Sequence, residues 1–119
     1  MAKILLAEDD ESMRGFLAKA LERAGHAVQS CSQGDEALEQ LTEAAFELLL
    51  TDIVMPVMDG IELARRASSQ YPDMKIMFIT GFAAVALNPD SQAPREAKVL
   101  SKPFHLRELV SEIDRLLAA

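Results

Sequence analysis

Cysteine, basic residues and long apolar runs are all scarce in this 119-residue chain. Cys31 is the only cysteine, which excludes an intrachain disulfide and a cysteine-based metal site. The chain has 12 Lys and Arg residues and 19 Asp and Glu residues. The resulting net charge of −7 argues against binding to nucleic acid or to an anionic membrane. No apolar run reaches the roughly 20 residues of a membrane span, and no signal peptide is visible. We therefore expect a cytoplasmic protein.

Short apolar runs alternate with helical patterns along the chain. Continuous apolar runs predict strands at 4–7, 27–31, 48–50, 76–79 and 97–100. Apolar residues three and four positions apart predict helices within 13–24, 37–41, 61–67 and 106–117. We interpret the alternation as successive βα units. It predicts one α/β domain over 1–119, in which a doubly wound parallel sheet of five strands has helices on both faces.

Glycine and proline mark several boundaries of these elements. Gly25 follows the first predicted helix at the position where a left-handed residue often ends a helix. Gln33-Gly34 predicts a turn before the second helix. Asn88-Pro89 lies in the stretch after Phe82, which is the one irregular part of the pattern.

Polar residues of a few kinds follow the predicted strands. They are Glu8, Asp9 and Asp10 after the first strand, Asp52 after the third, Thr80 and Gly81 after the fourth, and Lys102 after the fifth. In open parallel sheets, ligands bind at the carboxyl ends of the strands. We therefore expect these carboxylates, one hydroxyl and one ammonium to meet at one edge of the sheet.

The charges of this group predict a metal site and a phosphate chemistry. Glu8, Asp9 and Asp52 bring about three negative charges together, and Lys102 returns one positive charge. A hard divalent cation with oxygen ligands balances the remainder, and Mg²⁺ suits a site with few carboxylates. Mg²⁺ beside a carboxylate nucleophile favours formation of an aspartyl phosphate, whose oxygens the ammonium and hydroxyl would hold.

Each residue of the group also has an ordinary structural explanation. An aspartate at a strand end is often a helix cap or a turn residue. Taken singly, Thr80 is best explained as a helix cap and Lys102 as a surface residue. Together, four strand ends that supply matching groups favour a functional site over coincidence.

Four blocks of the sequence resemble the response-regulator receiver family. They are ILLAEDD at 4–10, LTDIVMPVMDG at 50–60, ITG at 79–81 and KPF at 102–104. The resemblance covers nearly the whole chain, and the spacing between the blocks also fits the family. It implies a flavodoxin-like sheet with strand order 2-1-3-4-5 and a switch that is controlled by phosphorylation.

The resemblance assigns the metal ligands and the phosphorylated residue. Asp52 is implied as the phosphoacceptor, and Asp9 and Asp52 as direct Mg²⁺ ligands. Glu8 is implied to act through a bound water, and the Val54 backbone carbonyl to complete the protein ligands.

The resemblance also assigns the residues that surround the phosphoryl group. Thr80 and Lys102 are implied to contact its oxygens, and Gly81 to be small enough to admit it. A cis peptide before Pro103 is implied to place Lys102.

The chain departs from the family pattern at two places. Receivers usually carry an aromatic residue three positions before the lysine, which rotates inward when the threonine moves. Here that position is Val99, and Phe82 is the alternative aromatic residue for the switch with Thr80. Asn88-Pro89 falls where the fourth helix of the family runs, so we expect that helix to be short or irregular because proline disrupts a helix interior.

Two segments, 81–87 and 99–109, are more specifically similar to a stand-alone receiver that regulates the ClpXP protease in the bacterial cell cycle. This similarity implies a protease-adaptor role in which the unphosphorylated form is active. Leu117-Ala118-Ala119 also resembles a terminal tag that ClpXP recognises, although a frayed helix end is an equally good explanation.

The family implies further features of the function. The phosphodonor is a histidine kinase or a histidine phosphotransferase. The chain is a receiver without an output domain. It accepts a phosphoryl group on its own Asp52 and can remove it by autodephosphorylation, so it is not an enzyme acting on other substrates.

Three alternative functions remain at this point. A receiver with another protein partner, or a phosphorelay intermediate, has the same residues. A haloacid-dehalogenase-type phosphatase also uses Asp, Mg²⁺, Ser or Thr, and Lys, but it needs a second acid two residues after the nucleophile, where this chain has Val54. A scaffold that never takes phosphate is the third alternative.

Overall fold

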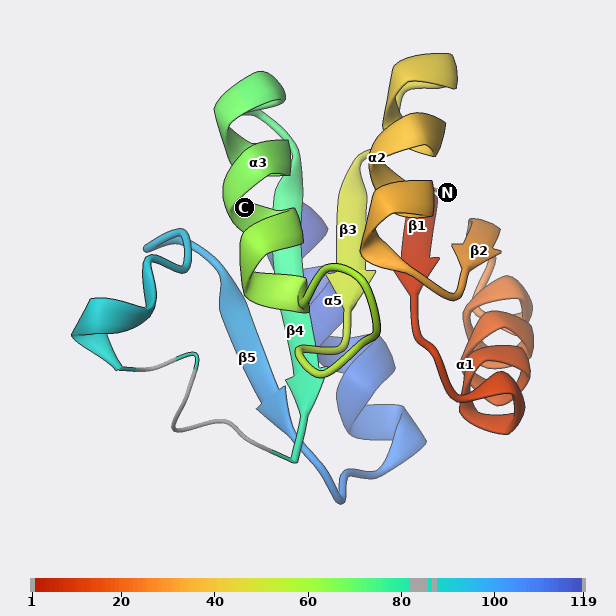
Figure 1. Ribbon diagram of the computed structural model, residues 1–119. Coiled ribbons are helices and arrows are strands. Elements are labelled where there is room, and N and C mark those ends of the chain that lie inside the picture. Colours follow the sequence, from red (N-terminus) through yellow and green to blue (C-terminus); the bar gives the residue numbers. More distant parts are fainter. Residues whose placement is uncertain (1, 82–85, 87, 119) are drawn as a thin grey trace.

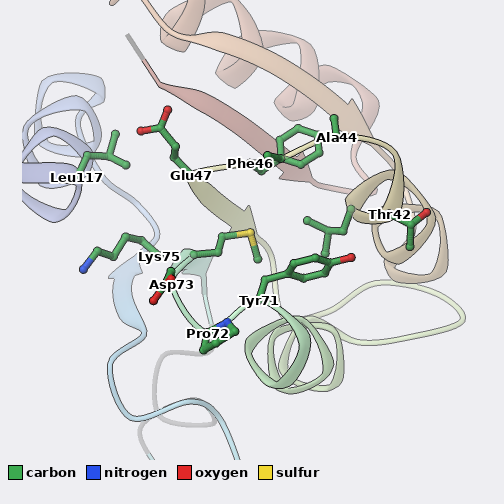
Figure 2. A pocket seen from close by; sticks show the side chains of 12 residues that line it. Thr42, Ala44, Phe46, Glu47, Tyr71, Pro72, Asp73, Lys75 and Leu117 are labelled. Atoms are coloured by element: carbon green, nitrogen blue, oxygen red, sulfur yellow. The ribbon is translucent and has the colours of Figure 1, made fainter.

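A computed structural model describes residues 2–81, 86 and 88–118 of the protein. Strands and helices alternate along it (Figure 1). The strands are β1 Lys3–Ala7, β2 Ala27–Cys31, β3 Leu48–Thr51, β4 Lys75–Thr80 and β5 Lys98–Ser101. The helices are α1 Glu11–Arg23, α2 Gly34–Glu43, α3 Gly60–Gln70 and α5 Leu106–Ala118, with a short 3₁₀ helix, η1, at Pro89–Ser91. Among the described residues, no helix is long and apolar enough to span a membrane.

The five strands form one parallel sheet in the order β2-β1-β3-β4-β5. β1 lies between β2 and β3, and Ala7 pairs with Cys31 on one side and with Thr51 on the other. The chain therefore leaves β1 and β3 at neighbouring points of one edge, where the strand order reverses. This confirms the predicted doubly wound sheet.

The sheet buries an apolar layer on each face, because successive residues of a strand point to opposite sides. On one face, Ile4 and Leu6 of β1 join a cluster with residues of α1 and α5. On the other, Leu5 and Ala7 join a cluster with residues of α2 and α3. The continuous apolar strands of the sequence are thus explained by burial on both faces.

Helix starts and ends follow local capping chemistry. The Asp10 carboxylate accepts a hydrogen bond from the Met13 amide at 3.0 Å and begins α1, and the Asp59 carboxylate accepts one from the Glu62 amide at 2.8 Å and begins α3. Gly25 has a φ of 100°, as expected for the residue that terminates the first helix.

The structure differs from the sequence analysis in small respects. Gly34 is the first residue of α2 rather than part of a turn, and it packs so closely on Met58 that a Cβ built there would lie 2.9 Å from the Met58 carbonyl oxygen. β5 lies one residue later than expected. The described residues from 88 to 94 contain only η1, which agrees with the expected irregular fourth helix.

Candidate functional site

The polar residues predicted to meet do so at the carboxyl edge of the sheet. Glu8 and Asp9 follow β1, Asp52 follows β3, and Lys102 follows β5 after Ser101. Thr80 is the last residue of β4 and is fully buried. These residues belong to four different strand ends, so the sheet alone determines that they are neighbours.

The acidic loop between β1 and α1 is held at several points. The Glu8 amide donates to the Cys31 carbonyl at 3.1 Å, and the Asp10 amide donates to Glu8 Oε2 at 3.3 Å. Arg14 donates from Nη1 to the Glu8 carbonyl at 2.8 Å. Glu8 consequently points inward and is only 1% exposed, whereas Asp9 remains exposed.

Asp52 and Lys102 form the central ion pair of the site. Lys102 Nζ lies 2.9 Å from Asp52 Oδ2 and 3.3 Å from Glu8 Oε1, so one ammonium contacts two acids. Asp52 Oδ1 accepts the Ile53 amide at 2.7 Å. Each oxygen of this carboxylate therefore has a different partner, which fixes the orientation of the group.

Lys102 is also tied to Thr80 through the backbone. Its amide donates to the Thr80 carbonyl at 2.8 Å, and the peptide bond that follows it, before Pro103, is cis. Gly81 is exposed, and a Cβ built there would have no heavy atom of the described residues within 4 Å. Among the described residues, none fills the space at this position beside Thr80.

Burial and the neighbouring charges shift the pKa values of Glu8 and Lys102. Burial, followed by the negative charge of Asp52, raises the pKa of Glu8 from 4.5 to about 7. Burial works against the charged form of Lys102, but its hydrogen bond to Asp52 and the charges of Asp52 and Glu8 prevail and raise its pKa. A single ammonium does not compensate this group of acids.

The acids fit a hard divalent cation. Glu8, Asp9 and Asp52 each offer a carboxylate oxygen, and these oxygens all lie within 4.8 Å of one another. The donor set consists of oxygen only, which Mg²⁺ prefers. The arrangement therefore suits the predicted cofactor.

The loop between β3 and α3 is a feature that the sequence analysis did not identify. The Met58 amide donates to the Pro56 carbonyl at 2.8 Å, and Val57 between them has a φ of 71°. This is a γ-turn in a strained form, with a β-branched residue in the left-handed region and 77% exposed. Gly60 then packs onto the Asp52 carbonyl group, and its amide donates to the Ile53 carbonyl at 2.7 Å.

The other predicted site residues have varied positions. Val99 is half-buried on β5 and packs against the cluster beneath α2 and α3, and Val54 is exposed after Asp52. Leu117 is half-buried and Ala118 is the exposed last residue of α5. Phe82 and Ala119 lie outside the described residues, so their predicted roles stay predictions.

Arg14 and Gly60 contact the site but were missed by the sequence analysis. Arg14 lies four residues beyond the Asp10 cap, so it is on the first turn of α1 and could have been found by considering which helical positions face the acidic loop. Gly60 ends the block at 50–60, but its close approach to Asp52 depends on tertiary packing, which the sequence pattern does not report.

Comparisons with known proteins agree with this geometry. A family model described as the response regulator receiver domain matches residues 4–114. The chain is 70% identical over 119 residues to the response regulator receiver protein CpdR of Brucella abortus (strain 2308), covering 100% of this chain and 99% of that protein. CpdR is the individual receiver that segments 81–87 and 99–109 were expected to resemble, so this similarity is confirmed.

Solved structures share the fold over the whole domain. The chemotaxis response regulator CheY4 of Vibrio cholerae superposes with a TM-score of 0.87 at 30% identity, covering 98% of both chains. TrrA of Thermotoga maritima, solved in complex with Mg²⁺ and BeF, gives a TM-score of 0.84 at 28% identity and covers 98% of this chain and 99% of that chain. The chain therefore belongs to the response regulator receiver domain family and is a component of two-component signalling.

Proposed function

We propose that Asp52 accepts a phosphoryl group and that this modification switches the contacts of the protein with a partner. The observation that carries the proposal is the ammonium of Lys102, 2.9 Å from Asp52 and 3.3 Å from Glu8, within a cluster of three carboxylates. A lysine ammonium that contacts acids at the carboxyl edge of a parallel sheet can hold an incoming anion beside a carboxylate.

The chemical step needs a nucleophile and groups that hold the transferred phosphoryl group. A carboxylate oxygen of Asp52 attacks phosphorus, so an O–P bond forms while the P–N bond of a phosphohistidine breaks and the departing imidazole keeps the electron pair. Lys102 and Thr80 hold the phosphoryl oxygens, and Gly81 leaves room for them. Hydrolysis reverses the modification when water attacks phosphorus and the O–P bond breaks.

We assign Mg²⁺ to Glu8, Asp9, Asp52 and the Val54 carbonyl. When bound, the ion supplies positive charge that offsets the carboxylates and stabilises the charge of the phosphoryl oxygens during transfer. Asp9 is the exposed acid of the set, whereas Glu8 and Asp52 are both buried and both contact Lys102, so the chain offers one ligand that is open to solvent and two that are held in place.

Labelling with a small phosphodonor tests the assignment of Asp52. Acetyl phosphate with MgCl₂ is expected to add one phosphoryl group to the wild-type chain and none to Asp52→Asn, as measured by intact-mass spectrometry. Asp59→Asn is the matched control, because Asp59 is an exposed acid of the same loop that caps α3. Phosphorylation of the Asp52→Asn variant, or of the wild type without Mg²⁺, would contradict the proposal.

The family and the overall similarity suggest the partners. A histidine kinase or histidine phosphotransferase supplies the phosphoryl group, as the receiver family implies. We propose ClpXP as the output partner, because segments 81–87 and 99–109 resemble a receiver that regulates this protease. These partners act in the cytoplasm, where we place the protein.

Capture experiments test the output partner and the sense of the switch. The unphosphorylated chain and Asp52→Ala are expected to retain ClpXP, and the chain treated with acetyl phosphate and Mg²⁺ to release it. Replacement of Ala118 and Ala119 by Asp tests separately whether the terminal residues are recognised, by means of the half-life of the protein itself. Loss of ClpXP from Asp52→Ala would show that the sense is wrong.

A further inference from the structure

Arg14 is the fourth residue of α1 and is half-buried beside the acidic loop. Its guanidinium donates from Nη1 to the backbone carbonyl of Glu8 at 2.8 Å. Other arginines of the described chain, such as Arg65 and Arg66, pair with a carboxylate on their own helix. No ion pair within 4.0 Å involves Arg14 in the part of the chain that the structure describes. Its polar contact is thus with the loop backbone.

The carbonyl that Arg14 holds belongs to the peptide between Glu8 and Asp9. The Glu8 amide is bound by Cys31 and the Glu8 carboxylate by Lys102 and the Asp10 amide. The Arg14 bond therefore fixes the remaining polar group of Glu8. Because both the amide and the carbonyl of Glu8 are hydrogen-bonded, the plane of the Glu8–Asp9 peptide is fixed. The orientation of this plane sets the position of the Asp9 Cα and the direction of its side chain.

We propose that Arg14 is a positioning residue for the acidic loop, which orients Glu8 and Asp9 to receive Mg²⁺. This inference rests on the Mg²⁺ site of the proposed function. It adds a residue that holds no metal itself and acts through the backbone of two ligands. Groups that orient metal ligands typically change metal affinity by about tenfold or more when they are removed.

The sign of the effect distinguishes positioning from simple electrostatics. The Arg14 guanidinium is a positive charge near the site, so its removal alone would strengthen the attraction of a cation. Loss of the hydrogen bond to Glu8 would weaken binding, because the loop would then have to be ordered by the ion. Weaker Mg²⁺ binding after the loss of a positive charge therefore has no electrostatic explanation.

The test is calorimetric titration of the full metal-free chain with MgCl₂. Arg14→Met retains the aliphatic stem and removes the donors, and it is expected to raise the Kd for Mg²⁺ about tenfold. Arg14→Lys keeps a cationic donor and is expected to recover most of the affinity. Arg23→Met is the matched control, because Arg23 is an exposed arginine in the last turn of the same helix, and its Kd is expected to stay within about twofold of wild type.

A second readout separates positioning from a general loss of structure. Phosphorylation of Arg14→Met by acetyl phosphate is expected to be slow at low Mg²⁺ and to reach the wild-type rate at saturating Mg²⁺, with an unchanged melting temperature of the metal-free chain. An unchanged or lower Kd for Arg14→Met overturns the inference while the proposed function stands. If the wild-type chain binds no Mg²⁺, the proposed function fails and this inference fails with it.

Discussion

At the residue scale, two glycines of the chain have opposite reasons to be glycine. Gly60 packs so closely on the Asp52 carbonyl group that a Cβ would lie 2.8 Å from its carbon, against rigid backbone. Gly15 lies inside α1, and a Cβ there would meet no side chain or neighbouring segment within 4 Å in the part of the chain that the structure describes. The first position therefore has no room for a side chain, whereas the second has no structural need for glycine.

We predict that Gly60→Ala and Gly15→Ala change stability in opposite directions. Gly60→Ala is expected to lower the free energy of unfolding by about 2–3 kcal/mol, because the loop after Asp52 must shift. Gly15→Ala is expected to raise it by about 0.5–1 kcal/mol, because alanine is the better helix former at an open position. Urea unfolding measures both, and equal effects of the two variants would contradict the explanation.

Cys31 is the residue that holds the Glu8 amide, and its thiol is buried at the end of β2. Burial, followed by the charge of Glu36, raises the pKa of the thiol to about 11, so the thiolate is scarce at neutral pH. We predict slow labelling by iodoacetamide at pH 8 in the folded chain and fast labelling in denaturant. Equal rates in the two conditions would show that the thiol is accessible.

At the scale of the elements, the start of α1 divides two adjacent aspartates between two roles. Asp10 caps the helix through the Met13 amide, whereas Asp9 belongs to the cluster of three carboxylates with Glu8 and Asp52. We predict that Asp10→Ala lowers the free energy of unfolding by about 1 kcal/mol and leaves the Mg²⁺ affinity nearly unchanged. Asp9→Ala is expected to abolish measurable Mg²⁺ binding with little loss of stability. Calorimetry and urea unfolding of the two variants together are the test, and equal losses of Mg²⁺ affinity would contradict it.

The sequence predicted those parts of the fold and site that depend on local pattern and on general rules of sheets. The strands were recognisable because each is buried on both faces, and the acids were placed together because parallel strands end at one edge. Gly34 was predicted in a turn, because only its packing on Met58 shows why a helix begins there. The γ-turn at Val57 and the Arg14 contact also depend on packing between segments, which periodicity does not report.

The segment between β4 and β5 is the element that departs most from a regular βα unit. The Asn88 side chain caps the turn at the Asp90 amide, the Ser91 amide bonds to the Asn88 carbonyl, and η1 then ends at Gln92 with a φ of 65°. We predict that the amides of the non-proline residues in 88–94 exchange within seconds, because a single exposed turn opens easily. The amides near Leu109 and Ile113, buried in α5, serve as the slow reference in hydrogen-exchange mass spectrometry. Comparable protection of both regions would contradict this prediction.

At the scale of the whole molecule, the acidic site lowers the stability of a fold whose sheet is otherwise well buried. The two apolar layers stabilise the fold, while the carboxyl edge holds Glu8 at 1% exposure beside Asp52. Because the pKa of Glu8 is about 7 in the folded chain and 4.5 when unperturbed, the folded state binds more protons between these values. Stability therefore falls as the pH rises through this window.

We predict that the metal-free chain loses up to about 3 kcal/mol of unfolding free energy between pH 4.5 and 7.5 through Glu8. Protonated Glu8 contributes its full stabilisation below the pKa that it has in the unfolded chain. This contribution is lost as the pH rises above the pKa that it has in the folded chain. Mg²⁺ binds the ionised carboxylates, so adding MgCl₂ is expected to restore stability at pH 7.5 and to have little effect at pH 4.5. Urea unfolding across this range measures the trend, and Glu8→Gln, which is neutral throughout, is expected to flatten it. If wild type and Glu8→Gln have the same pH profile, Glu8 is not the source of the effect and its charge is compensated within the folded chain.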